Sequence, residues 1–248
     1  MESRLPLDYL LIYSILFLAC FLHGVTGFGS ALVAIPLIAM VLEVKKTIPL
    51  VVLVAGTMNF VLLVQLWRHV RWDRIRPLLI GAVPGILLGV LFLKRVDETS
   101  IRLVLGAVLL VYAVYGLLLR VSPRGIPQIW AYLFGFLAGG VGGAFGIIGP
   151  PVVAYVSLQP WNKDEVKALL QGFFFLAGGL VIGLYVYMGI ATREVLSLYV
   201  LALPVLGLGW FLGSALYGKI QEGIYRKAVL LLLGCMGFTM IWQSGVWS

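Results

Sequence analysis

The chain has few charged residues. Only 11% of its 248 residues are Asp, Glu, Lys or Arg, 62% are hydrophobic, and the mean hydropathy is +1.07. A soluble domain needs roughly 25% charged residues, so this composition excludes an ordinary soluble domain and indicates a membrane protein. The net charge of +8 does not indicate binding to nucleic acid, because the basic residues stand in short segments between apolar runs, as in multi-pass proteins with basic cytoplasmic loops.

Cysteine and histidine are also scarce, with two of each. Cys20 and Cys235 lie in apolar runs outside any Cys-x-x-Cys or Cys/His cluster, so we expect buried thiols and neither a disulfide nor a metal. Hydrolysis or phosphoryl transfer would need a nucleophile beside a base, or a metal cluster, and His23 has no carboxylate partner in the apolar runs. We therefore expect no enzyme activity and no cofactor.

About eight apolar runs follow one another, and about six have the length of a single membrane crossing. Residues 9–42 and 127–160 form two longer runs that would overshoot the bilayer as straight helices. Both contain versions of one segment, because residues 21–36 align with residues 136–151 at a constant offset of 115. Each copy is a glycine-rich break, where backbone N–H groups can face a cavity with no side chain in the way. We expect turns within 24–29 and 139–149.

The repeat extends over nearly the whole chain, and we divide it into residues 1–122 and 123–248, two membrane repeats of a single integral membrane domain. Basic segments at 68–76, 120–124 and 219–227 are expected in the cytoplasm, and the N-terminus and Lys45-Lys46 outside. Both ends of the fifth run then lie inside, so that run must return as a hairpin and the two halves are inverted. We expect an all-α polytopic protein of 8–10 helices, with an uncleaved first segment and no soluble domain.

Each half opens with a Gly-x-x-Gly-x-Gly-type break followed by a proline. The motifs are Gly24-Val25-Thr26-Gly27-Phe28-Gly29-Ser30 through Pro36, and Gly139-Gly140-Val141-Gly142-Gly143-Ala144-Phe145-Gly146 through Pro150-Pro151. Two such four-segment repeats resemble the sulfite exporter TauE/SafE family, also called the toluene sulfonate uptake permease group. The resemblance implies a multi-pass protein of the cell membrane that carries sulfite, sulfoacetate or other organosulfonates. Neither copy has the family's three consecutive glycines, and Phe28 and Phe145 near the turns point to a bulkier organic anion.

The apolar runs contain no Asp, Glu, Lys or Arg, so an anion must be held by neutral donors and helix N-termini. The second helix of each hairpin begins at its break, and two such ends facing each other across a pseudo-two-fold axis would form the site. We expect Gly27 and Gly142 to line that cavity. The candidate substrate-binding residues are His23, Thr26, Gly27, Gly29, Ser30, Asn59, Gly142, Gly143, Gly146 and Gln171; Tyr155 and Tyr185 are weaker candidates.

Several of these residues have a second interpretation. His23 either carries a proton or donates to the anion, or it is a neutral histidine that bonds a carbonyl group. Asn59 and Gln171 either face the cavity or bond a neighbouring helix. Other glycines form ridges for helix packing, namely Gly81/Gly85/Gly89, Gly179/Gly183 and Gly209/Gly213, and for this reason we expect Gly85→Ala to remain nearly active.

The expected function is export of a small sulfur-containing anion down its electrochemical gradient, because an inside-negative potential drives anions outward. The alternatives are a proton-coupled importer that uses His23, and a membrane subunit of a larger complex with no transport of its own. The expected partners are the small anion and the lipid bilayer, and the sequence leaves the oligomeric state open.

Overall fold

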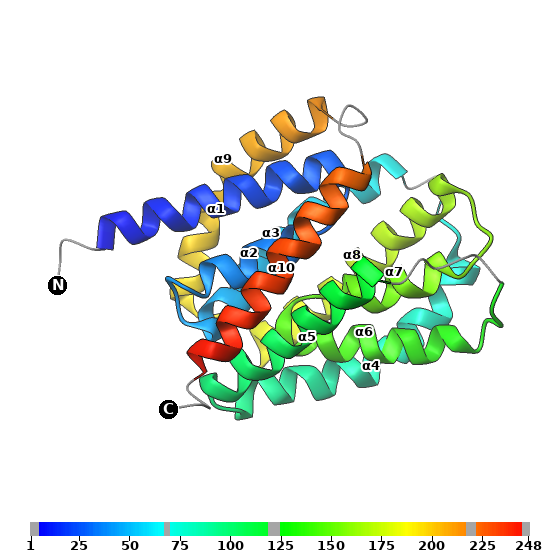
Figure 1. The fold of residues 1–248 in the computed structure, drawn as a ribbon, viewed down its shortest axis with the longest axis horizontal. Helices are drawn as coiled ribbons and strands as arrows, with labels where there is room; N and C mark the ends of the chain where they lie inside the picture. Colours follow the sequence, from blue (N-terminus) through cyan, green and yellow to red (C-terminus); the bar gives the residue numbers. More distant parts are fainter. Residues whose placement is uncertain (1–4, 67–69, 119–124, 217–221, 245–248) are drawn as a thin grey trace. The chain divides into compact units, whose positions relative to one another are not determined.

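The computed structural model describes residues 5–66, 70–118, 125–216 and 222–244, and in this part the chain forms ten α-helices and no strand (Figure 1). The helices are α1 (Leu5–Thr26), α2 (Ser30–Ile38), α3 (Val44–Leu66), α4 (Trp72–Arg95), α5 (Glu98–Leu118), α6 (Trp130–Phe145), α7 (Gly149–Ser157), α8 (Lys163–Tyr187), α9 (Arg193–Ala215) and α10 (Glu222–Gln243). Six of them, α1, α3, α4, α5, α8 and α9, are long and apolar enough to cross a membrane. The predicted all-α, polytopic architecture is confirmed.

Both long apolar runs are broken where the glycines cluster. In the first run α1 ends at Thr26 and α2 begins at Ser30, and in the second α6 ends at Phe145 and α7 begins at Gly149. The helices that follow the breaks, α2 and α7, have nine residues each. At 1.5 Å per residue they extend about 14 Å, less than half of the roughly 30 Å hydrocarbon thickness. The predicted breaks are therefore present, and the second arm of each broken segment is a half-length helix.

The helices gather into two compact units, each with helices from both sequence repeats. One unit comprises Met1–Val51, Asp97–Leu119 and Thr192–Ser248, and so contains α1, α2, α5, α9 and α10. The other comprises Val52–Val96 and Arg120–Ala191, with most of α3 and all of α4, α6, α7 and α8. The compact units and the predicted repeats 1–122 and 123–248 are thus different divisions of the same chain.

Within each unit a helix of one repeat packs closely on a helix of the other. In Figure 1, α1 lies beside α9, and α4 lies beside α6. Glycines permit this close approach: a Cβ atom at Gly85 of α4 would overlap the carbonyl oxygen of Phe136, and one at Gly213 of α9 would overlap that of Phe21. Small residues let backbones meet in this way where lipid provides no hydrophobic driving force between helices. The packing role predicted for the ridges at Gly85 and Gly213 is confirmed.

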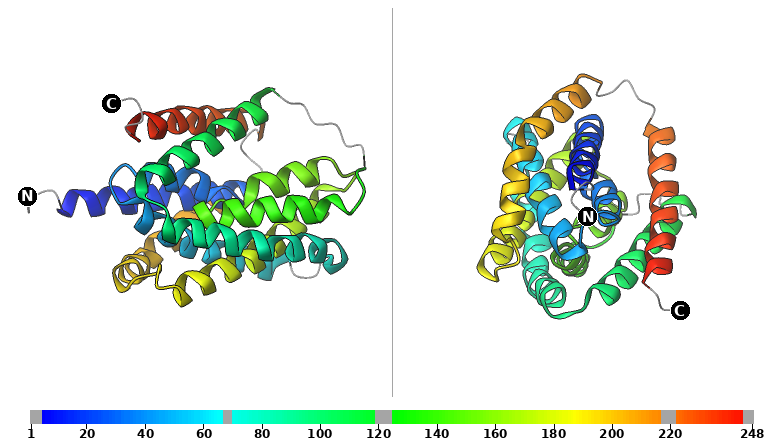
Figure 2. Two further views of the ribbon diagram at one scale, coloured as in Figure 1. Left: turned by 90° about the horizontal axis from the view of Figure 1, so that it is seen from below. Right: turned by 90° about the vertical axis from the view of Figure 1, so that its left-hand side faces the viewer.

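Helices α5 and α10 pair with each other in the first unit (Figure 2). A Cβ atom at Gly106 would lie 2.7 Å from the oxygen of Gly237, whereas one at Gly116, later in α5, would lie 2.7 Å from Leu230, earlier in α10. The two helices therefore run in opposite directions. Helix α5 begins at Glu98, four residues before Arg102, and α10 begins at Glu222, four residues before Arg226, so the two helices are counterparts in the repeat. Their antiparallel pairing is what an inverted repeat requires.

The helix ends and the turn glycines define the structural register of the repeat. Helix α1 ends at Thr26 and α6 at Phe145, and α2 begins at Ser30 and α7 at Gly149, an offset of 119 residues in both cases. The positive-φ glycines Gly27 and Gly146 have the same offset, and the N–H of each donates to the carbonyl group four residues earlier. The structural register thus differs by four residues, about one helical turn, from the sequence offset of 115.

Two expectations about the ridges require correction. Gly179 and Gly183 have nothing within 4 Å of an added Cβ atom, so in the part of the chain described here these glycines do not pack closely on a neighbouring helix. A methyl group at Gly85 would meet backbone atoms of α6, so Gly85→Ala is not the mild substitution that the sequence suggested.

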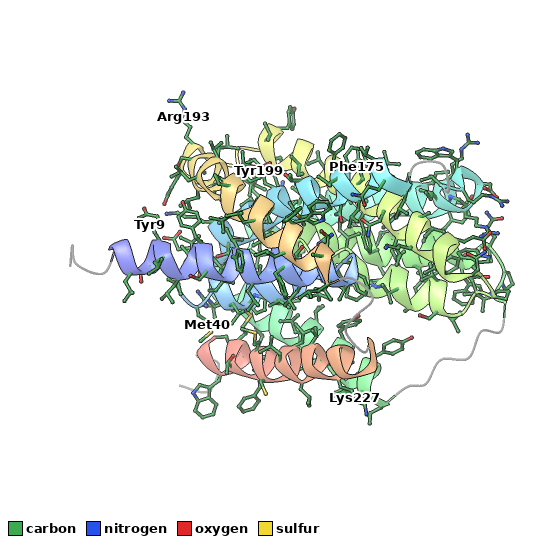
Figure 3. All side chains as sticks on the ribbon, turned by 90° about the horizontal axis from the view of Figure 1, so that it is seen from above. Tyr9, Met40, Phe175, Arg193, Tyr199 and Lys227 are labelled. Carbon is green, nitrogen blue, oxygen red and sulfur yellow. The ribbon has the colours of Figure 1, made fainter. Side chains whose placement is uncertain are left out.

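Charged side chains hold the helix ends. The carboxylate of Glu98 accepts from Arg102 at 2.7 Å and from the N–H of Val44 at 3.2 Å, while Arg102 donates to the carbonyl of Ala39 at 3.0 Å. This clamp fixes the loop between α2 and α3 to the start of α5. Figure 3 shows Arg193, at the start of α9, projecting away from the ribbon.

The second unit has a corresponding contact at the start of α8. Arg74 pairs with Glu165 at 3.1 Å and lies 4.5 Å from the ring centroid of Trp161. Of the basic segments that we expect in the cytoplasm, the first is described at Arg71, Arg74 and Arg76. The segment 120–124 lies outside the described residues, and the side chains of most of 219–227 are not described. The sidedness of the chain stays a prediction.

Candidate functional site

The first break is a three-residue turn between α1 and α2. Gly27 has φ 82° and Gly29 has φ 96°, left-handed conformations that strongly favour glycine. The N–H of Gly27 donates to the carbonyl of His23 at 2.6 Å and closes the last turn of α1. A Cβ atom added at Gly29 would have nothing within 4 Å. Backbone conformation therefore requires glycine at both positions, and open space adjoins the turn at Gly29.

His23 connects the two arms of this broken segment. Its Nδ1 lies 2.9 Å from the hydroxyl oxygen of Ser30, the first residue of α2. Both side chains are buried, His23 with 2% and Ser30 with 1% of its surface exposed. The second ring nitrogen of His23, Nε2, is buried and has no hydrogen-bond partner. The chain therefore holds an imidazole at the break with one nitrogen bonded across it and one available.

Thr26 has a local role. Its hydroxyl lies 2.8 Å from the carbonyl oxygen of Leu22 and 2.7 Å from that of Phe28. These contacts join the end of α1 to the turn. The described geometry therefore shows Thr26 shaping the break, whereas its predicted contact with substrate stays a prediction.

The first turn of α2 carries free N–H donors. Gly29 is the N-cap residue and provides no side-chain hydrogen bond. The first N–H of the helix with a backbone acceptor is that of Val33, which donates to Gly29 at 3.4 Å. In the described part of the chain, the N–H groups of Ser30, Ala31 and Leu32 thus keep the unpaired state typical of a helix N-terminus, which carries partial positive charge.

The second break is built differently. Here Gly146 has φ 70°, and its N–H donates to the carbonyl of Gly142 at 2.8 Å. A Cβ atom at Gly142 would lie 2.5 Å from the Ile148 side chain, and one at Gly143 would lie 2.5 Å from the carbonyl oxygen of Ile86 on α4. Gly146 therefore makes the turn, Gly142 leaves room for Ile148, and Gly143 permits the close packing of α6 on α4.

Tyr185 completes the end of α6. Its hydroxyl donates to the carbonyl of Gly143 at 2.9 Å, and the side chain is 1% exposed. A helix leaves its last carbonyl groups without intrahelical partners, so this long-range contact satisfies one of them. The sequence indicated Tyr185 only as a weaker candidate, because nothing local connects it with a residue 42 positions earlier.

Asn59 and Gln171 lie on α3 and α8, both in the second unit. Both are buried, Asn59 with 7% and Gln171 with 1% exposed. The amide oxygen of Asn59 has no hydrogen-bond partner. The structure brings His23, Thr26, Gly27, Gly29 and Ser30 together at the first break, and Gly142, Gly143 and Gly146 at the second, whereas Asn59 and Gln171 belong to neither turn.

The buried interior of the described chain carries little charge. Its buried polar side chains are His23, Ser30, Thr47, Asn59, Gln159, Gln171 and Ser244. None of these is Lys, Arg, Asp or Glu. Any ligand bound among these residues is therefore recognised by hydrogen bonds and helix ends and not by an ion pair.

A duplicated, all-helical membrane chain in which each half opens with a broken helix has the architecture of a transporter for small solutes. The chain belongs to the sulfite exporter TauE/SafE family, whose profile matches residues 12–240. The family resemblance stated from the sequence is thereby confirmed, and the family is one of membrane transporters.

Two curated proteins are similar to this chain. One, named "Probable sulfite/organosulfonate exporter TauE", is from Cupriavidus necator and is 26% identical over 260 aligned positions, which cover 100% of this chain and 99% of the relative. The other, named "Probable inner membrane transporter protein TsaS", is from Comamonas testosteroni and is 26% identical over 190 positions, 75% of each chain. No solved structure matches the chain.

Proposed function

We propose that the protein exports small sulfur-containing anions, such as sulfite, sulfoacetate or other organosulfonates, through the cell membrane. Family membership supports transport, and the name of the Cupriavidus necator relative supports the substrate class. The location is supported by the name of the Comamonas testosteroni relative, an inner membrane transporter. A chain of this kind requires a neutral binding site for the anion inside the bilayer.

The first break is the observation that carries the proposal. It combines three unpaired N–H groups at the start of α2, open space beside Gly29, and a buried imidazole with a free ring nitrogen. Sulfite and sulfonate groups present three oxygen atoms that accept hydrogen bonds, and helix N-termini bind such anions well. We therefore place His23, Thr26, Gly27, Gly29 and Ser30 at the substrate site, with the remaining candidates Asn59, Gly142, Gly143, Gly146 and Gln171 as further residues of the transport path.

Export down the electrochemical gradient follows from the charge of the substrate. An inside-negative potential favours outward movement of an anion by about 2.3 kcal/mol per charge for each 100 mV. The buried polar side chains of the described residues include no carboxylate that would carry a driving proton. The simplest cycle therefore moves the anion alone.

A proton-coupled importer is the second candidate, and His23 is the observation that favours it. An imidazole is the side chain whose charge changes most readily near neutral pH, and this one is connected by Ser30 to the start of α2. Uptake against the potential would need such a coupled proton.

Flux into proteoliposomes that contain only this protein tests both candidates. We expect sulfite or an organosulfonate to move with an imposed membrane potential and to be insensitive to an imposed pH gradient. Flux that ignores the potential, follows the pH gradient and loses this dependence in His23→Ala would contradict export by uniport and support the importer. No flux of any sulfur anion would support a role as a subunit without transport of its own.

A further inference from the structure

We propose that the anion is bound at only one of the two breaks: its sulfur–oxygen head lies against the first turn of α2, and the equivalent end of α7 takes no anion. This inference rests on the proposed function. The duplicated sequence predicts a symmetric site made by both breaks, and the inference assigns the anion to the first break alone. It is carried by the different chemistry of the two helix ends in the 119-residue register that the helix ends and turn glycines define.

The end of α2 offers a cluster of donors. The N–H groups of Ser30, Ala31 and Leu32 have no acceptor in the described part of the chain, and Gly29 provides no capping side chain. Gly29 and Ala31 are partly exposed, and the space beside Gly29 is open. An oxyanion can therefore approach these N–H groups from the side of the turn without displacing a side chain.

His23 provides the independent sign that a ligand belongs here. Only 2% of the His23 surface is exposed, yet its Nε2 has no hydrogen-bond partner. A buried polar group without a partner is costly in a protein interior. When the Ser30 hydroxyl donates to Nδ1, the other nitrogen carries the proton, and Nε2–H is a further donor on the side chain that is bonded to the start of α2. An anion bound at the first turn of α2 satisfies the three backbone N–H groups, and His23 is the buried side chain beside them that still lacks a partner.

The end of α7 has fewer donors. Ser30, Ala31 and Leu32 correspond in the structural register to Gly149, Pro150 and Pro151. Proline has no backbone N–H, so two of the three donors are missing. His23 corresponds to Gly142, and the Ile148 side chain occupies the space beside it.

The surroundings of the second break are apolar as well. A Cβ atom at Gly149 would lie 3.8 Å from the Phe174 ring, and Ile147 is 1% exposed. The carbonyl of Gly143 nearby is already bonded to Tyr185. A carbonyl oxygen and apolar side chains repel or fail to solvate an anion. The first turn of α7 offers the N–H groups of Gly149 and Val152, which the two prolines separate, and no imidazole, so it does not reproduce the adjacent donors of the first break.

Two substitutions test the inference directly, one that adds a proline to α2 and one that removes a proline from α7. Ala31→Pro removes one N–H from α2, at a helix position where α7 itself carries a proline, and proline is tolerated in a first helical turn. Pro150→Ala adds an N–H at the equivalent position of α7. Binding of sulfite and of methanesulfonate to the purified full-length protein is measured by titration calorimetry. We expect Ala31→Pro to weaken binding about tenfold or more and Pro150→Ala to leave it unchanged.

The native protein provides a measurement that depends on no variant. The inference requires one anion bound per chain at saturation. Two anions per chain, tighter binding in Pro150→Ala, or undiminished binding in a folded Ala31→Pro protein would each overturn it. A native protein that transports sulfur anions with two bound per chain would leave the proposed function intact, whereas a native protein that binds no sulfur anion would contradict the proposed function itself.

Discussion

At the residue scale, His23 has two nitrogen atoms with different roles. Nδ1 holds Ser30 across the first break, and Nε2 has no partner in the structure. Loss of the contact at Nδ1 would loosen the junction of α1 and α2, whereas loss of the donor at Nε2 would affect only a bound ligand. Because the two nitrogens lie at different distances from the backbone, amide side chains of two lengths can test their roles separately.

We predict that His23→Asn weakens anion binding more than His23→Gln does. The Asn amide reaches about as far as Nδ1 and retains a partner for Ser30, while the longer Gln amide reaches toward the position of Nε2. A hydrogen bond to a charged group contributes about 1.5–3 kcal/mol, so His23→Asn should weaken anion binding about 10- to 100-fold and His23→Gln should weaken it less. Calorimetric titration with methanesulfonate measures both. Equal binding by the two variants would contradict a ligand contact at Nε2.

At the element scale, glycines serve two purposes, turn formation and close helix packing, which cannot be told apart in the sequence. Gly27, Gly29 and Gly146 have positive φ and make the turns. Gly85 and Gly143 are helical and leave room for a neighbouring backbone. A side chain at a turn glycine strains the break, whereas one at a packing glycine separates two helices.

Gly85→Ala should be markedly destabilising. Its methyl group would overlap the carbonyl oxygen of Phe136, which is backbone and cannot rotate away, and such overpacking costs about 1–3 kcal/mol. Gly183→Ala is the matched control, because it lies within α8 and nothing lies within 4 Å of its added Cβ. Thermal unfolding in detergent should show a lower midpoint for Gly85→Ala alone. A similar midpoint for both variants would mean that α4 and α6 are not in close contact.

The clamp at the start of α5 also belongs to this scale. Arg102 bonds Glu98 and the carbonyl of Ala39, and its side chain is 20% exposed. Arg102→Ala removes both contacts, so we expect the loop between α2 and α3 to open more readily, by about 1–3 kcal/mol. Amide hydrogen exchange at residues 39–44 should accelerate. Arg193→Ala, which removes a side chain that projects from the ribbon (Figure 3), should leave that exchange unchanged, and unchanged exchange in Arg102→Ala would disprove the clamp.

At the scale of the whole molecule, the antiparallel pair of α5 and α10 supports an inverted repeat. An inverted chain places equivalent loops on opposite sides of the membrane. The basic segment that contains Arg71 is expected in the cytoplasm because positively charged loops are retained there, and Arg193, at the start of α9, is then expected outside.

Cysteine labelling in whole cells tests this sidedness. In a Cys20→Ala/Cys235→Ala background, we expect a membrane-impermeant thiol reagent to label Arg193→Cys in intact cells and Arg71→Cys only after the cells are permeabilised. The two native cysteines must be removed because Cys235 is exposed. The reverse pattern would invert the topology, and labelling of both sites in intact cells would contradict the inverted repeat.

Local chemistry made much of this protein predictable from its sequence. The 62% hydrophobic composition determines a membrane protein, because only that composition is stable in hydrocarbon. Clusters of glycine within overlong apolar runs determine two helix breaks, because glycine alone adopts positive φ at little cost. His23 and Ser30 were predicted as site residues for the same local reason, since both lie at the first break.

The register of the repeat was decided by the tertiary structure alone. A shift of four residues is close to one turn of 3.6 residues, so it leaves the glycines on the same helix face and is almost invisible in the sequence. The ends of α1 and α6, the starts of α2 and α7, and the left-handed glycines Gly27 and Gly146 distinguish an offset of 119 from one of 115. That difference makes Pro150 and Pro151 the equivalents of Ala31 and Leu32, because the position of the helix break, and not residue identity, sets which positions are equivalent.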